Sequence, residues 1–260
     1  MEPKNKSFPT ENQFKSRLLD KELLLGGWAS MGSTVATEIL GLSGLDWVLI
    51  DGEHGANDHS SCVHQLLALN NGPAAAFIRP EANNPILLKR LLDFGFYNFI
   101  IPMVENREQA IEAVRATRYP PAGIRGVSVT QRSNRFGLQD DYFSKINDSI
   151  CVVAQIESQL AVENIQQIAS VPGIDCLFIG PQDLAASLGF LANPTAPEVQ
   201  SVIRSLIDSI HAHNKPIGIL VANEEEAKKF QALGVTFIGI SSDQSMIKRG
   251  AQQIVKAMRS

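Results

Sequence analysis

The sequence predicts a (β/α)8 barrel. Eight apolar runs of strand length recur along the chain, and they are continuous rather than alternating in polarity, as expected for strands buried on both faces. Segments with helical patterns separate these runs, and a length of 260 residues suits one such barrel. A doubly wound open sheet is the alternative, but that fold usually has fewer strands, and no glycine-rich dinucleotide fingerprint follows the first run. The expected strands span residues 23–28, 46–51, 74–79, 98–103, 151–156, 175–180, 216–221 and 236–241.

The helical segments carry their own start and stop signals. Asn84 followed by Pro85 supplies an N-cap and a first-turn proline, and Gly95 ends that helix. A second helix is expected over 159–170 after Ser158, which can act as its N-cap. Further helices are expected over 11–21, after Asn106, over 197–213, between Asn223 and Gly234, and from Ser242 to about Met258.

Composition and charge narrow the class of protein. A net charge of −4 argues against nucleic acid as the main partner. The three cysteines form no C-x-x-C pair, so neither a disulfide framework nor a structural zinc site is indicated. Residues 1–11 lack the apolar segment of a secretory signal, and no apolar run reaches membrane-spanning length. We therefore expect a soluble cytoplasmic protein, with a loose polar tail over 1–10 and a single domain over 11–260.

One connection is unusually long. Roughly thirty residues between Arg118 and Ser149 are rich in proline, glycine, arginine and asparagine, whereas loops beyond about 12–15 residues are uncommon unless they have a function. The connection follows a helix, so it starts at the amino end of the barrel. We expect it to cross either to the functional site or to a neighbouring subunit.

Polar residues gather where four of the expected strands end. Because the carboxyl ends of barrel strands meet at one face, residues far apart in sequence can converge there. The second strand ends in Asp51-Gly52-Glu53-His54, the third in Arg79, the fifth in Gln155-Ile156-Glu157 and the sixth in Gly180-Pro181-Gln182-Asp183.

Two of these residues are candidate metal ligands. Glu157 and Asp183 follow adjacent strands, and a pair of carboxylates without thiolate or paired histidine suits a hard divalent ion such as Mg²⁺, with Mn²⁺ as an alternative. Taken singly, each carboxylate is about as well explained as a helix N-cap. The pairing on neighbouring strands favours the metal.

His54 and Arg79 are the candidate acid–base and anion-binding residues. His54 is the only histidine at a strand end, where its titration range suits a general base; its plainer interpretation is a hydrogen-bonded turn residue. Arg79 suits a carboxylate or a developing oxyanion, or else an ion pair with Asp93 or Glu53. No lysine lies at the carboxyl end of a strand, which disfavours a Schiff-base aldolase.

Long stretches of the chain, covering roughly 12–258, resemble the HpcH/HpaI class II pyruvate aldolases. The resemblance implies a modified TIM barrel that assembles as a homo-hexamer, a trimer of dimers, with the last helix exchanged between neighbours. The matching stretches are LDWVLIDGEH (45–54), IRP (78–80), RLLDFGFYNFIIPMVE (90–105), RYPPAGIRGVS (118–128), VAQIES (153–158), LFIGPQDLAASLG (177–189), GILVANEEEAKKF (218–230) and FIGISSD (237–243).

The resemblance also implies roles for the site residues. It implies Mg²⁺ held by Glu157 and Asp183, and contacts between the keto acid and Gln155, Gln182 and Asp183. His54 matches the catalytic base, Arg79 the residue that stabilises the enolate, and Asp93 an acid that raises the basicity of the histidine.

Two departures from the family pattern stand in the site. Gln182 replaces an expected serine or alanine, which would alter the pocket through its larger side chain. Gly55-Ala56 replaces an expected Ala-Pro, which we expect to loosen the loop after His54.

The resemblance implies reversible aldol cleavage of a 2-keto-4-hydroxy dicarboxylate to pyruvate and an aldehyde. Within the family, the 91–102 segment is most similar to the branch acting on a keto acid derived from glucarate, and next to the branch acting on a hydroxylated keto-heptanedioate. We expect the arginine-rich 118–137 segment to hold the distal carboxylate, either in its own subunit or in a neighbouring one. A non-catalytic barrel that binds a keto acid is the rival hypothesis, because barrels host many functions.

Overall fold

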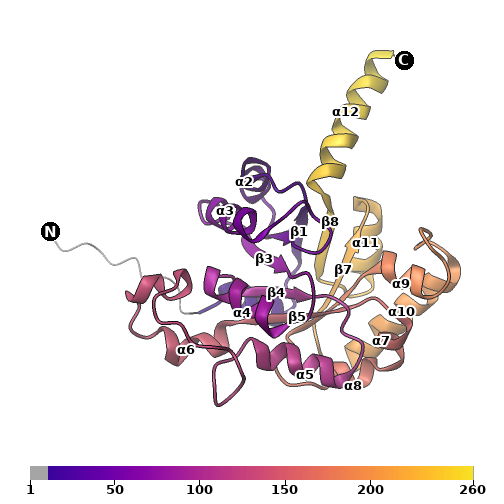
Figure 1. Ribbon diagram of the computed structural model, residues 1–260. Helices are drawn as coiled ribbons and strands as arrows, with labels where there is room; N and C mark the ends of the chain where they lie inside the picture. The colour runs from indigo at the N-terminus through magenta and orange to yellow at the C-terminus, as the bar shows by residue number, and fades with distance from the viewer. Residues whose placement is uncertain (1–10, 260) are drawn as a thin grey trace.

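Eight parallel strands close into a barrel in sequence order, as the computed structural model of residues 11–259 shows (Figure 1). Each strand coincides with one of the expected apolar runs, so the barrel prediction is confirmed and the open sheet is excluded. The strands are β1 (Leu24–Ala29), β2 (Trp47–Asp51), β3 (Ala75–Arg79), β4 (Asn98–Ile101), β5 (Cys151–Ile156), β6 (Cys176–Ile179), β7 (Ile217–Val221) and β8 (Phe237–Ser242).

Helices surround the barrel, and their ends follow the sequence signals. The Asn84 side chain accepts a hydrogen bond from the backbone of Ile86, and Gly95 ends the same helix in the left-handed conformation. No described helix is long and apolar enough to cross a membrane. The helices are α1 (Gln13–Leu19), α2 (Thr34–Leu42), α3 (His59–Leu69), α4 (Pro85–Phe94), α5 (Arg107–Ala116), α6 (Tyr142–Ser149), α7 (Gln159–Glu163), α8 (Ile165–Ala169), α9 (Pro181–Ser187), α10 (Pro197–Ala212), α11 (Glu224–Ala232) and α12 (Asp243–Arg259), with a short 3-10 segment, η1 (Arg132–Gly137).

One helix prediction is wrong in detail. The segment 159–170 forms two short helices, α7 and α8, with a break at Asn164. The Asn164 amide donates to the backbone oxygen of Glu105 at 3.0 Å, and such side-chain bonds to backbone compete with a continuous helix.

Aromatic side chains fill the inside of the barrel. Trp28, Trp47 and Phe178 pack there with Phe77 and Phe237 in one buried cluster. Glycines make the room for these rings: a Cβ on Gly26 would lie 2.1 Å from the Trp47 ring, and one on Gly239 would lie 2.3 Å from the Trp28 ring. The interior is therefore a packed core and not a channel. A second core lies between the sheet and the helices.

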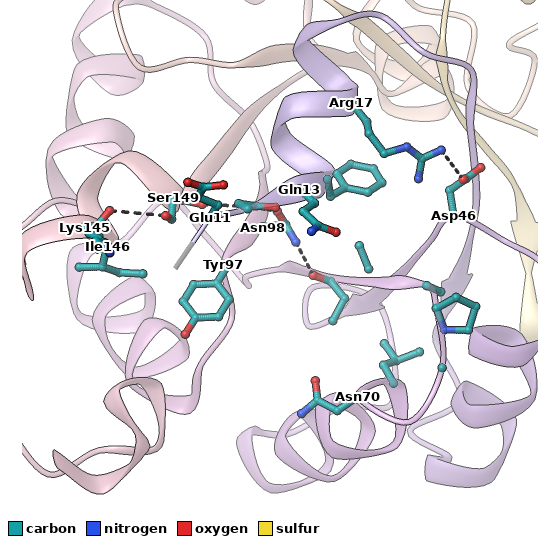
Figure 2. A pocket seen from close by; sticks show the side chains of 18 of the residues that line it. Glu11, Gln13, Arg17, Asp46, Asn70, Tyr97, Asn98, Lys145, Ile146 and Ser149 are labelled. Carbon is teal, nitrogen blue, oxygen red and sulfur yellow. Dashed lines mark hydrogen bonds and ion pairs between the residues drawn. The ribbon is translucent and has the colours of Figure 1, made fainter. Parts of the chain in front are cut away.

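Helix α1 closes the amino end of the barrel. Its Phe14 ring meets the Phe77 ring edge-on, with centroids 5.0 Å apart. Beside it lies a cavity of about 400 Å³, in which the Arg17 guanidinium points toward Asp46 and pairs with it at 2.8 Å (Figure 2). The amide of Asn98 also lies in this cavity and donates to the backbone oxygen of Ala76. The pair between Arg17 and Asp46 helps to hold α1 against the barrel, and the Asn98 bond links the neighbouring strands β3 and β4.

The long connection after α5 stays near the amino end of the barrel. Arg125 pairs with Asp93 near the end of α4 at 3.0 Å, and Arg132 donates to the backbone oxygen of Phe94 at 2.7 Å. Within the described chain, no residue of 118–149 lines the cavity at the carboxyl ends of the strands. The expectation that this segment reaches the site of its own protomer is therefore wrong, because Arg125 and Arg132 hold it against the end of α4. Contact with a neighbouring subunit stays a prediction.

The last helix stands away from the barrel. Figure 1 shows α12 in yellow, projecting beyond the other helices. Asp243 at its start is buried, whereas the side chains of 251–259 are exposed. Apolar residues are among them: Ile254 is 67% exposed and Met258 81%. A helix of this composition leaves an apolar surface open to water.

Candidate active site

A cavity of about 610 Å³ opens at the carboxyl ends of the strands. Five of the residues predicted for the site line it, which confirms that the strand ends converge: His54, Arg79, Gln155, Gln182 and Asp183. Its floor includes Trp28 and Phe178 from the aromatic interior, so an apolar surface lies beneath a polar wall.

Arg79 is fixed by a two-pronged ion pair with Asp51. The two residues end neighbouring strands in direct register. The Arg79 Nε donates to Asp51 Oδ1 at 2.9 Å, and Nη2 donates to Oδ2 at 2.7 Å. Both side chains are buried, with 7% and 3% exposure. Planar double contacts of this kind set the orientation of a guanidinium more firmly than a single bond.

A second carboxylate completes the support of Arg79. Glu53 Oε2 lies 2.9 Å from Arg79 Nη1. Asp51 Oδ1 also accepts the backbone N–H groups of Glu53 and His54, at 3.1 and 3.3 Å, which fixes the turn after β2. The expected pair of Arg79 with Glu53 is confirmed. The stronger partner, Asp51, escaped the sequence reasoning, although matched positions at the ends of adjacent strands would have pointed to it.

His54 lies at the mouth of the cavity. Its side chain is 66% exposed, and its Nε2 lies 3.8 Å from Glu53 Oε2. In the loop that follows, the Asn57 amide donates to the backbone oxygen of Asp51 at 2.9 Å, and a Cβ on Gly55 would lie 2.3 Å from the same oxygen. Gly55 thus permits a close approach of two backbone segments. The loosening expected from Gly55-Ala56 stays a prediction.

Glu157 is a buried carboxylate with little positive charge around it. The backbone N–H of Met103 donates to Oε1 at 2.8 Å, and the Gln155 amide donates to Oε2 at 2.5 Å. Burial is the main cause that raises the pKa of Glu157 to about 7. The negative charges of Glu53 and Asp183 act in the same direction, and the Met103 hydrogen bond and Arg79 oppose them. A group in this state gains from a nearby cation.

The donors around Glu157 fit a divalent ion. Asp183 lies in the first turn of α9, exposed toward the cavity, and its charge acts on Glu157. The oxygen of the Gln155 amide is buried and has no hydrogen-bond partner among the described residues. A Cβ on Gly180 would lie 2.6 Å from Glu157 Oε2, so this glycine keeps the space beside the carboxylate open.

The protein alone would supply few ligands. Among residues 11–259, no cluster of three or more histidine, cysteine, aspartate or glutamate side chains is placed to hold a metal ion. Mg²⁺ commonly takes one or two protein carboxylates and completes its octahedron with water and substrate. Glu157 and Asp183 match that pattern.

Of two other predicted residues, Gln182 lies in the cavity lining and Asp93 lies outside it. Gln182 is exposed and lines the cavity, so its larger side chain does face the site. Asp93 lies near the end of α4, where Arg125 pairs with it at 3.0 Å, and it is not in the cavity lining of its own protomer. The geometry of one protomer therefore does not bring Asp93 to His54.

Three cations in the cavity lining were missed. Lys229 projects from α11, and Lys248 and Arg249 project from α12. All three lie within helices and not at strand ends, which is why a search of strand ends did not find them.

Comparison with known proteins decides the family. The model of the HpcH/HpaI aldolase/citrate lyase family matches residues 25–249. The chain belongs to this family. Membership confirms the resemblance drawn from the sequence. Curated relatives named 5-keto-4-deoxy-D-glucarate aldolase make the protein a carbon–carbon lyase. A curated relative from Enterobacter sp. (strain 638), named 5-keto-4-deoxy-D-glucarate aldolase, is 46% identical over 98% of this chain and 99% of its own length.

Solved structures agree with the barrel. An HpcH/HpaI aldolase/citrate lyase family protein from Burkholderia cenocepacia J2315 is 37% identical, with a TM-score of 0.93 over 96% of this chain and 100% of that chain. An HpcH/HpaI aldolase from Desulfitobacterium hafniense DCB-2 is 26% identical, with a TM-score of 0.87 over 95% and 96% of the two chains.

Proposed function

We propose that the protein is a metal-dependent class II aldolase that cleaves 2-dehydro-3-deoxy-D-glucarate, and related 2-keto-4-hydroxy acids, reversibly to pyruvate and tartronate semialdehyde. The observation that carries this proposal is the single cavity in which His54, Arg79 and Asp183 converge from three strand ends. The near-full-length relative named for 5-keto-4-deoxy-D-glucarate supports the choice of substrate.

The residues have distinct tasks in the proposed reaction. Cleavage breaks the C3–C4 bond, with the C4 hydroxyl losing its proton and C3 gaining one when pyruvate forms. His54, exposed at the cavity mouth, assists removal of the hydroxyl proton. Arg79, oriented by Asp51 and Glu53, faces the negative charge that develops on the enolate oxygen.

Glu157 and Asp183 would hold Mg²⁺, or Mn²⁺ in its place. The bound ion supplies Lewis acidity toward the keto group. Gln155 orients Glu157 through its amide N–H, and its unpartnered oxygen is available to a ligand. The apolar floor of Trp28 and Phe178 excludes water beneath the reacting carbons.

Pyruvate release tests the proposal directly. We expect lactate dehydrogenase to detect pyruvate from 2-dehydro-3-deoxy-D-glucarate, with kcat/KM at least about tenfold above that for 4-hydroxy-2-oxoheptanedioate, since the two aldehyde products differ in polar groups that the site must match. A preference for the heptanedioate, with succinate semialdehyde as product, would reassign the substrate. Release from neither compound would leave the keto-acid-binding barrel as the better hypothesis.

We also propose a homo-hexamer, a trimer of dimers, in which α12 is exchanged between neighbours. Support comes from the apolar residues that α12 leaves exposed and from a second exposed set on α2, which α12 adjoins at its base. Burying one such side chain contributes about 1.5–3 kcal/mol. The exposed residues are Ile247, Ile254, Val255 and Met258 on α12, and Val35, Ile39 and Leu42 on α2.

The assembly is tested by a charge on the apolar face of α12. We expect Ile254→Glu to lower the mass seen by light scattering, because an ionised carboxylate in a contact costs several kcal/mol. Gln253→Glu, one residue away at an exposed polar position, is the control. A wild-type protein that runs at 28.3 kDa would refute the hexamer.

We infer a cytoplasmic location as well. Cys62, Cys151 and Cys176 are all buried free thiols, a state that suits a reducing compartment.

A further inference from the structure

We propose that Lys229, Lys248 and Arg249, here called the distal rim, bind the carboxylate at the far end of the substrate and so select aldehydes that carry a negative charge. The inference rests on the proposed function and names a part of the site that the aldol chemistry itself does not require.

The distal rim shares one cavity with the catalytic residues. Lys229 comes from α11, which follows β7, and the other two come from the first turns of α12, which follows β8. The candidate metal ligands follow β5 and β6, so the rim occupies the next sector of the barrel mouth. A linear keto acid anchored at the metal sector can extend across the cavity toward the rim.

Uncharged groups position two of the rim cations. Lys229 Nζ donates to Gln200 Oε1 at 2.7 Å, and Arg249 Nη1 donates to the backbone oxygen of Ala222 at 3.3 Å. Over residues 11–259, no ion pair joins any of the three to a carboxylate. The charges of Lys229 and Arg249 are therefore held in place, and none of the three cations is neutralised by an ion pair among these residues.

The other charged groups of the cavity are not available to bind the distal carboxylate. Arg79 is already paired with two carboxylates. The one acid on the wall of the rim, Glu226, accepts from the backbone N–H of Ala222 at 3.0 Å and lies beside its own helix start. Three cations against one carboxylate leave this wall with an excess of positive charge, which complements an anion.

Within one protomer, the arginines of the 118–137 segment do not hold the distal carboxylate, because three of them bind groups away from the cavity. Their contact with the site of a neighbouring subunit stays a prediction. Arg118 donates to the backbone oxygen of Ile150, Arg125 pairs with Asp93, and Arg132 donates to Phe94. A terminal carboxylate in the cavity of this protomer therefore has the rim as its cationic partner.

Aldol addition with two aldehydes of equal chain length tests the rim. The assay measures kcat/KM for pyruvate plus succinate semialdehyde, which is anionic, and for pyruvate plus butanal, which is neutral. We expect Lys248→Gln and Lys229→Gln to lower the value for succinate semialdehyde by about tenfold each, as for loss of a hydrogen bond to a charged group, and to leave butanal nearly unchanged.

Matched variants distinguish a specific contact between the rim and the carboxylate from an effect of the overall surface charge. Lys228→Gln, on the same helix but outside the cavity lining, should change neither aldehyde. Lys248→Arg should keep most of the discrimination. Equal losses for both aldehydes, or the same loss in the Lys228 control, would overturn the role of the rim.

Exchange of the pyruvate methyl hydrogens in D2O distinguishes failure of the rim proposal from failure of the proposed aldolase function. This exchange needs enolate formation but no aldehyde. The rim variants could catalyse both exchange and addition and still prefer succinate semialdehyde over butanal as strongly as the wild type. That result would refute the role of the rim and leave the proposed aldolase standing. An enzyme that catalyses neither exchange nor addition refutes the proposed aldolase and the rim with it.

Discussion

Glu157→Gln is expected to lower pyruvate release by about a thousandfold, which corresponds to ~4 kcal/mol of transition-state stabilisation. The glutamine keeps the size of the side chain but removes the charge that would attract a divalent ion. In the wild type, EDTA should cause a comparable loss and added Mg²⁺ should restore activity. In the variant, added Mg²⁺ should not restore it.

The control for this substitution is Glu163→Gln. Glu163 is exposed on α7 and bonds only to Gln159 among the described residues, so its loss should leave kcat/KM unchanged. Full wild-type activity in chelator, together with trapping of the substrate by borohydride, would contradict a metal-dependent reaction.

The raised pKa of Glu157 gives the same prediction a pH dependence. A proton competes with the metal for this carboxylate, so Mg²⁺ affinity measured by calorimetry should rise about tenfold per pH unit below neutrality and level off above a pH of about 7. The free energy of unfolding of the metal-free protein should instead decrease as the pH rises. Because the folded pKa lies above the ordinary 4.5, the folded state retains the proton longer than the unfolded chain, and stability falls as the pH rises from 4.5 to about 7.

Arg79→Ala is expected to reduce both catalysis and stability. Removing a donor that faces a developing oxyanion costs about a hundredfold to a thousandfold in kcat. The same change leaves Asp51 and Glu53 without their cation, and removing one partner of a buried pair costs about 3–5 kcal/mol. The two effects are separated by measuring kcat below the unfolding temperature of the variant.

Two further variants assign the role of Arg79. Arg79→Lys keeps the charge but cannot reproduce the two parallel bonds to Asp51, so it should recover more stability than activity. Arg79→Met with Asp51→Asn removes the charge pair together and should be more stable than Arg79→Ala while remaining inactive. Near-wild-type kcat in any folded variant without Arg79 would make the residue purely structural.

The barrel was predictable because its strands are continuous apolar runs. Burial on both faces leaves no polar alternation, and the runs ending at Asp51, Arg79 and Ile156 coincide with strands that the structure contains. The convergence of the site followed from the same pattern, since parallel strands place their last residues on one face.

The rest depended on contacts that a linear pattern does not contain. The sequence places Asp51 at the end of the second strand, but its two bonds to Arg79 follow from strand register. Asn164 interrupts a helix because of a bond to Glu105 across a gap of 59 residues. Lys248 reaches the cavity from within a helix, at a position that resembles any exposed surface lysine.

Trp28 belongs both to the aromatic interior of the barrel and to the floor of the cavity. Its ring fits against Gly239 with no room for a further methyl group. Changes to the floor are therefore tied to the stability of the whole barrel, whereas the exposed Lys229 and Lys248 can be exchanged at little cost to folding. We therefore expect specificity for new aldehydes to evolve by substitutions in the distal rim, while the residues that bind pyruvate stay constant.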